Sequence, residues 1–270
     1  MDAGDRGERR GGSGRNRRIA LLVQYRGTCF NGWQMQKGGR TVQQTVENAL
    51  EIITKERHRI VASGRTDSGV HALGQVVHMD TDRDIPLEKL CYSLNGILER
   101  DVSIKNAYNV NHEFHARYDA VEREYIYLIY NHPQRNPFLE ERALWVNYPL
   151  DVDYLKEASG YLLGEKDFSS FCKKISMEGN MVRRIINISL HRKDDLISFR
   201  IRGNAFLHNM IRIIIGTLLE MYRENREPGF MQEVLVRKDR DCSGITAPAC
   251  GLYLSEVIYH PPLNSYESAF

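Results

Sequence analysis

The sequence has no long apolar run and few cysteines. Its longest stretch without Asp, Glu, Lys or Arg covers 14 residues, 242–255, and is rich in Gly, Pro and Ser. A transmembrane helix needs about 20 apolar residues, so we expect no membrane association. The five cysteines are odd in number and include no CxxC pair. This argues against a disulfide framework or a structural zinc site and is typical of a reduced, cytoplasmic protein.

An excess of either charge is also missing. There are 37 basic and 35 acidic residues, which gives a net charge of +2. Residues 1–18 hold six Arg against three acids, so the rest of the chain sums to −1. A nucleic-acid surface would therefore depend on local placement of basic side chains. The Gly- and Arg-rich composition predicts a disordered basic tail over 1–17, which is either an electrostatic arm for a polyanion or a tolerated ragged terminus.

The composition is otherwise that of an ordinary globular protein, with 42% hydrophobic residues. The spacing of these residues along the chain predicts the same order of secondary-structure elements twice. In the first half, strand, helix, strand, strand, helix and strand are expected at 18–24, 42–56, 59–62, 75–79, 86–99 and 102–110. In the second half they are expected at 124–130, 152–163, 182–192, 196–202, 206–224 and 252–259, with another helix at 229–236. This β-α-β-β-α-β order predicts an α+β fold of two tandem ferredoxin-like halves, 18–112 and 113–270. A cleft between the halves is the expected ligand site.

The segment 63–72 (SGRTDSGVHA) is the densest in chemically useful residues and lies between the second and third predicted strands. Its glycines permit tight turns and close approach of a ligand to the backbone. Asp67 has three interpretations from these residues alone: it stabilises a turn, binds a metal, or acts as a nucleophile or general base. No second carboxylate lies close in sequence, which argues against the metal.

Arg212 is the only charged residue between Arg202 and Glu220. Because its neighbours are almost all apolar, the helix that carries it should be largely buried. A buried, unpaired guanidinium costs several kcal/mol, so Arg212 needs either an anionic partner or an edge position that reaches water. A carboxylate partner in the cleft would be held ionised, which suits nucleophilic attack.

An ordered series of motifs over 18–260 resembles the TruA family of tRNA pseudouridine synthases. The most specific is ASGRTDSGVHA at 62–72, which matches the family's catalytic signature. The other matching motifs are QYRGTCFNGWQ (24–34), TVQ (41–43) followed by Glu47, FHAR (114–117), REY (123–125), DFSSF (167–171), FLHNMIR (206–212) and APACGLYL (247–254).

This resemblance implies that the two ferredoxin-like halves form one extended antiparallel sheet with a central catalytic cleft. It implies an isomerase that converts uridine to pseudouridine at positions 38, 39 and 40 of the tRNA anticodon stem-loop, without cofactor or metal. Bacterial members of the family are homodimers that bind tRNA across both subunits. The expected partners are therefore the anticodon arm of tRNA and a second copy of this chain, and the expected location is the cytoplasm.

The resemblance also implies roles for individual residues. Asp67 matches the catalytic aspartate, which attacks C1′ of the ribose or C6 of the uracil, or assists glycal formation. Tyr125 matches the tyrosine that lies against the uracil and is a candidate for the final abstraction of the C5 proton. Arg212 matches the arginine that pairs with the aspartate, and Arg65 the arginine implicated in base flipping. An RNA-contacting segment, or alternatively a plain interdomain linker, is formed by Phe114, His115, Ala116, Arg117 and Tyr118.

Two other classes of function are open at this point. An RNA-binding module without catalysis would share the split β-α-β-β-α-β architecture of the RRM, although the chain has no RNP1 pattern and places Asp67 in a loop. A metal-dependent phosphoryl-transfer enzyme needs clustered carboxylates or a GxxxxGK[ST] loop, and the sequence has neither. Activity that survives loss of Asp67 would favour the first, and sensitivity to EDTA would favour the second.

Overall fold

The structure, a computed structural model, describes residues 17–174 and 179–270. In its first part the elements follow the predicted order. They are β1 (Arg17–Tyr25), α1 (Val42–Thr54), β2 (Val61–Ala62), β3 (His71–Thr81), α2 (Leu87–Ile97) and β4 (Val102–Val110). The main differences from prediction are that β2 is shorter and that β3 is longer at both ends.

The second part adds three short strands, β6, β7 and β11, that the sequence pattern did not indicate. The elements are β5 (Ala120–Asn131), β6 (Leu144–Val146), α3 (Val152–Gly160), β7 (Gly164–Asp167), β8 (Val182–Lys193), β9 (Leu196–Gly203), α4 (Met210–Arg223), α5 (Phe230–Arg237), β10 (Leu252–Tyr259) and β11 (Glu267–Ser268). The predicted start of α4 at residue 206 is wrong. The helix begins at Met210, because Asn209 before it has a left-handed backbone with φ 63°.

Residues 1–16 of the predicted tail lie outside the described residues. Arg17, which the prediction included in the tail, belongs to β1 and pairs with Thr81 of β3. Its neighbour Arg18 donates to both carboxylate oxygens of Asp80 at 2.6 and 2.7 Å. The sheet hydrogen bonds and this bidentate ion pair fix Arg17 and Arg18 in β1.

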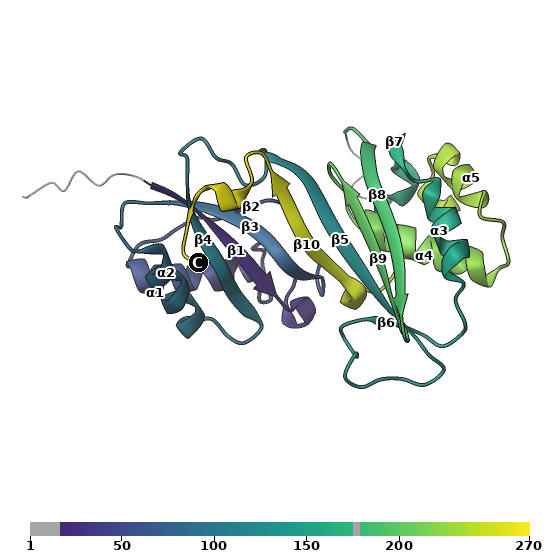
Figure 1. Cartoon of the computed structure of the whole chain (residues 1–270), viewed down its shortest axis with the longest axis horizontal. Coiled ribbons are helices and arrows are strands. Elements are labelled where there is room, and N and C mark those ends of the chain that lie inside the picture. The colour runs from purple at the N-terminus through teal and green to yellow at the C-terminus, as the bar shows by residue number, and fades with distance from the viewer. Residues whose placement is uncertain (1–16, 175–178) are drawn as a thin grey trace, which may run out of the picture.

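One large sheet runs through the molecule in the order β11-β4-β1-β3-β10-β5-β9-β8-β7, with β2 paired to β3 and β6 to β5. Figure 1 shows α1 and α2 at one end of this sheet and α3, α4 and α5 at the other. The first part thus contributes β4-β1-β3-β2, and the second contributes β10-β5-β9-β8 in the equivalent order. The predicted mixture of helices and one large sheet is confirmed.

The expectation of a purely antiparallel sheet is wrong where the two parts meet. There β3 and β10 pair in parallel, with His71 opposite Tyr253 and Ala72 opposite Leu254. The pair β5–β6 is also parallel, and the other strand pairs in the described ranges are antiparallel. The direction of β10 is set by its antiparallel pairing with β5, so its direction relative to β3 follows from how the two parts join.

The helices cover two hydrophobic clusters. The first is formed mostly by the first part and includes Leu254 and Val257 of β10, and the second is formed mostly by the second part and includes Val70. In α1, the Thr41 hydroxyl accepts a hydrogen bond from the Gln44 amide at 3.4 Å and so caps the start of the helix. Val46 and Leu50 of the same helix are fully buried in the first cluster. Tyr125 of β5 is partly buried and packs against both clusters, so it marks their junction. No helix in the described ranges is long and apolar enough to cross a membrane.

Candidate active site

Asp67 lies in the loop that joins β2 to β3, and backbone contacts with the segment after β1 fix the path of this loop. The Trp33 amide donates to the Thr66 carbonyl at 3.1 Å, and the Gly69 amide donates to the Phe30 carbonyl at 3.3 Å. The loop is therefore held immediately before and after Asp67. This double attachment gives its carboxylate a defined position.

Two glycines allow this close approach of backbones. A Cβ atom on Gly32, whose φ is +81°, would lie 2.6 Å from the Thr66 carbonyl oxygen. A Cβ atom on Gly27 would lie 2.0 Å from the Val70 carbonyl oxygen. Both distances are shorter than real contacts allow, so the motif at 24–34 needs glycine at these positions to support the loop of Asp67.

Arg212 of α4 contacts Asp67 from the other part of the molecule. Its Nη1 lies 3.4 Å from Asp67 Oδ2, and the two side chains are 17% and 27% exposed. Arg212 also donates through Nε to the Ala247 carbonyl at 2.8 Å and through Nη1 to Asn209 Oδ1 at 3.2 Å. The predicted pairing of Arg212 with a carboxylate is confirmed, and its guanidinium is held by three groups.

His208 is a second neighbour of Asp67, and the sequence reasoning did not identify it. Its Nε2 lies 3.3 Å from Asp67 Oδ1, and its side chain is 40% exposed. The sequence feature that could have indicated His208 is its position as a polar side chain in the motif FLHNMIR, four residues before Arg212. Helical spacing could not have placed it, because the chain departs from helical geometry at Asn209.

Tyr125 belongs to the same site. Its ring lies edge-on to Phe206, with centroids 5.2 Å apart at an interplanar angle of 80°. Burial raises the pKa of Tyr125 to about 12, against a smaller lowering by Arg123 and with a further raising by the Asp67 carboxylate. The phenol is therefore neutral at pH 7 and can donate a hydrogen bond. To accept a proton from carbon it must first lose its own.

Arg123 connects the loop of Asp67 to two other segments. Its Nη2 donates to the Ser63 and Arg117 carbonyls at 3.0 and 2.8 Å. Its Nη1 donates to the Ala120 and Asn204 carbonyls, both at 2.9 Å. Burial lowers the pKa of Arg123, against a smaller raising by Tyr125 and Tyr259 and with a further lowering by Arg117. One guanidinium thus joins the start of the Asp67 loop, the connection between the two parts and the segment that leads to α4.

The remaining predicted site residues differ in exposure. Arg65 is exposed, two residues before Asp67. Phe114 and Ala116 are 6% and 0% exposed and belong to the first hydrophobic cluster, so their side chains are not part of the outer surface of the segment 114–118. They are apolar and face the core, whereas their neighbours face outward.

The surface of that segment is made by His115, Arg117 and Tyr118. Tyr118 is 76% exposed, and its ring stacks on His115 with centroids 4.2 Å apart at 26°. The Arg117 guanidinium carbon lies 5.8 Å from the Tyr118 ring centroid. An exposed aromatic ring beside a guanidinium is a suitable surface for a nucleobase or a phosphate.

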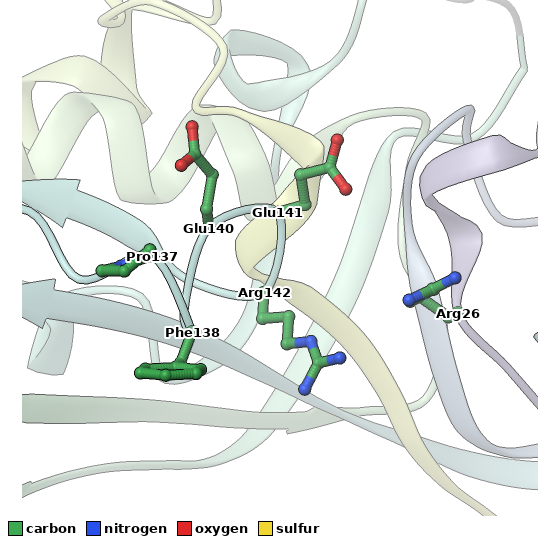
Figure 2. Close-up of a pocket in the computed structure, with 6 residues that line it drawn as sticks. All are labelled: Arg26, Pro137, Phe138, Glu140, Glu141 and Arg142. Carbon is green, nitrogen blue, oxygen red and sulfur yellow. The ribbon is translucent and has the colours of Figure 1, made fainter.

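A pocket of about 300 Å³ lies between the residue after β1 and the loop 137–142. Figure 2 shows Arg26 on one side and Glu140, Glu141 and Arg142 on the loop opposite. Two arginines and two glutamates leave no net charge among these side chains, and none of the predicted site residues lines the pocket. In the described ranges, no three His, Cys, Asp or Glu side chains are grouped so that they could hold a metal ion.

Comparison with known proteins agrees with the motif series. A family model described as tRNA pseudouridine synthase matches residues 21–119 and 158–260. The chain is 43% identical over 244 residues to tRNA pseudouridine synthase A of Bacillus pumilus, which covers 90% of this chain and 99% of that protein. It is 42% identical over 243 residues to the protein of the same name from Paraburkholderia xenovorans, which covers 90% of each. The similarity to a chain of a solved Cbf5-Nop10-Gar1 complex, with a TM-score of 0.35 and 10% identity over 73% of this chain and 52% of that one, is too weak to bear on the fold.

Proposed function

Because this chain belongs to the family of tRNA pseudouridine synthases, which are isomerases, we propose that it converts uridine to pseudouridine at positions 38, 39 and 40 of the tRNA anticodon stem-loop. Asp67 is the nucleophile. The observation that carries this proposal is the carboxylate of Asp67, which has Arg212 on one oxygen and His208 on the other. A substrate base that enters there would also meet Tyr125.

The chemistry needs one nucleophile and one proton transfer. The N1–C1′ bond breaks, the uracil turns, and C5 bonds to C1′, so the same atoms are present before and after. Asp67 acts by attack on C1′ or on C6, or by assisting glycal formation. In the net reaction C5 loses a proton and N1 gains one. Because nothing is oxidised, reduced or hydrolysed, we propose that no metal or cofactor takes part.

The other residues bind and orient the substrate. Arg212 fixes the Asp67 carboxylate, and Tyr125 lies against the uracil with a neutral hydroxyl that can donate to it. Arg65, exposed beside Asp67, fills the space that the extruded base leaves, which offsets part of the unstacking cost of a few kcal/mol. His115, Arg117 and Tyr118 form the RNA-contacting surface.

The fold is composed of two ferredoxin-like halves that meet at residues 112 and 113, and the first half begins with β1 at Arg17. This is supported by the order β4-β1-β3-β2, which recurs as β10-β5-β9-β8. The central catalytic cleft lies where the halves join, beside Tyr125. The enzyme acts as a homodimer on the anticodon arm in the cytoplasm, as its resemblance to bacterial members of the family implies.

The test is a pseudouridine assay on tRNA transcripts, with EDTA present, for the wild type and for Asp67→Ala. Asp84→Ala is the matched control, because the Asp84 side chain is fully exposed. We expect the wild type and the control to modify positions 38–40, and Asp67→Ala to bind tRNA and modify nothing.

Each other result contradicts a specific part of the proposal. If the wild type binds tRNA and modifies no uridine, the RNA-binding module becomes the better account. If Asp67→Ala remains active, Asp67 is not the nucleophile. If activity appears only without EDTA, a metal takes part in the reaction.

A further inference from the structure

The carboxylate of Asp67 is contacted on both oxygens by side chains from one short segment. Arg212 Nη1 lies 3.4 Å from Oδ2, and His208 Nε2 lies 3.3 Å from Oδ1. The Asp67 side chain is still 27% exposed, so a substrate can reach it. The position of this carboxylate therefore depends on His208 as well as on Arg212.

Arg212 alone does not determine how the carboxylate is turned. The Arg212 guanidinium has a fixed position, because it also donates to the Ala247 carbonyl and to Asn209 Oδ1. It contacts only one oxygen of Asp67, however. The torsion between Cβ and a carboxylate has a broad energy profile, so a carboxylate held at one oxygen can still rotate. A contact at the second oxygen removes that freedom.

The backbone around His208 is well suited to provide this second contact. The His208 carbonyl accepts a hydrogen bond from the Lys173 amide at 3.1 Å, and the Leu207 carbonyl accepts one from the Met210 amide at 3.1 Å. Between them, Asn209 turns the chain into α4 with a left-handed backbone. The imidazole is thus presented from a segment that is held on both sides, which is how residues that orient a reacting group are built.

We propose that His208 is a positioning residue for the reaction: the contact of its Nε2 with Asp67 Oδ1 holds the carboxylate in the orientation from which one oxygen attacks the substrate. The inference rests on the proposed function of Asp67. It requires a proton on Nε2 of His208, because a ring nitrogen without a proton would repel the carboxylate oxygen instead of holding it. His208 itself forms no bond to the substrate.

Two substitutions separate the N–H donor from the volume of the ring. His208→Gln keeps an N–H donor at a similar reach, whereas His208→Phe keeps a ring and has no donor. His191→Phe is the control, since His191 is an exposed histidine on β8. The measurements are the single-turnover rate of isomerisation at saturating enzyme, the dissociation constant for tRNA, and the thermal midpoint.

We expect His208→Phe to lower the single-turnover rate about 10- to 100-fold, the effect of a displaced reacting group, with unchanged tRNA binding and thermal midpoint. His208→Gln should recover most of the rate, and the control should match the wild type. A purely structural role would instead lower the rate, the binding and the midpoint together.

The inference is overturned if His208→Phe keeps the wild-type rate, if His208→Gln is as slow as His208→Phe, or if the loss of rate follows the loss of stability. The wild-type rate separates this inference from the proposed function. A wild type that isomerises no uridine overturns both, whereas an active wild type with an unaffected His208→Phe overturns this inference alone.

Discussion

The guanidinium of Arg212 lies 3.4 Å from the carboxylate of Asp67, although the two residues are 145 positions apart in the chain. Arg212 belongs to α4 in the second part of the molecule, and Asp67 to the β2–β3 loop in the first. The pair therefore bridges the two parts of the molecule, as does the pairing of β3 with β10.

The geometry of this pair predicts that Arg212→Lys is a damaging change. A lysine keeps the positive charge, but its compact ammonium cannot reach Asp67, the Ala247 carbonyl and Asn209 in the directions that the guanidinium serves. We expect the single-turnover rate to fall about 100-fold with little change in tRNA binding. Arg223→Lys, at the exposed end of α4, is the control. An Arg212→Lys variant with full activity would show that charge alone suffices.

The four carbonyls around Arg123 predict an effect on stability. In Arg123→Lys, one ammonium group replaces a guanidinium whose two terminal nitrogens donate to four carbonyls, those of Ser63, Arg117, Ala120 and Asn204. At about 1 kcal/mol for each lost hydrogen bond, the free energy of unfolding should fall by about 2–4 kcal/mol.

Urea denaturation measures this as a lower midpoint with an unchanged slope. Arg135→Lys, at an exposed loop position, is the matched control. Equal midpoints for Arg123→Lys and the wild type would mean that these hydrogen bonds contribute nothing net.

Gly32 and Gly38 allow backbone strain to be separated from steric overlap. Both have positive φ, +81° and +79°, but a Cβ on Gly38 meets nothing within 4 Å, whereas one on Gly32 lies 2.6 Å from the Thr66 carbonyl. Gly38→Ala should cost about 1 kcal/mol for its conformation alone. Gly32→Ala should cost more and also lower the rate of isomerisation, because it displaces the loop of Asp67. Similar stability and activity for the two variants would contradict the close approach of Gly32 to the Thr66 carbonyl.

His78 predicts how stability depends on pH. It is 6% exposed, and its Nδ1 accepts a hydrogen bond from the Ala116 amide at 3.1 Å. Burial, with the nearby Arg18 and His115, lowers the pKa of His78 from 6.5 to about 4. The unfolded chain therefore takes up a proton that the native state excludes. Above pH 6.5 His78 is neutral in both states and does not reduce stability. As the pH falls from 6.5 to about 4, protonation of the unfolded chain lowers the free energy of unfolding by up to ~3 kcal/mol.

The measurement is the free energy of unfolding at pH 7, 5.5 and 4 for the wild type and His78→Gln. The glutamine does not titrate, so its stability should fall less steeply over this range. Curves of equal slope would contradict the assigned role. His191→Gln is the control, because His191 is an exposed histidine on β8 and is not among the groups that shift the pKa of His78.

Most of the element order could be predicted from the sequence because each element has a local cause. The bounds of β4 and β10 agree with prediction, since both are short stretches rich in apolar and aromatic residues. The Thr41 hydroxyl marks the start of α1 through a contact only three residues away. Asp67 was found by its motif, and Arg212 by the rule that a charge in an apolar helix needs a partner.

The tertiary structure alone decided what depends on distant segments. The parallel pairing of β3 with β10 follows from how two parts join, which no local pattern contains. Burial of Phe114 and Ala116 depends on which side of their segment faces the first hydrophobic cluster. The contact of His208 with Asp67 depends on a left-handed turn before α4 and on a loop far away in sequence. Periodicity reports what one segment prefers, whereas a site is made where several segments meet.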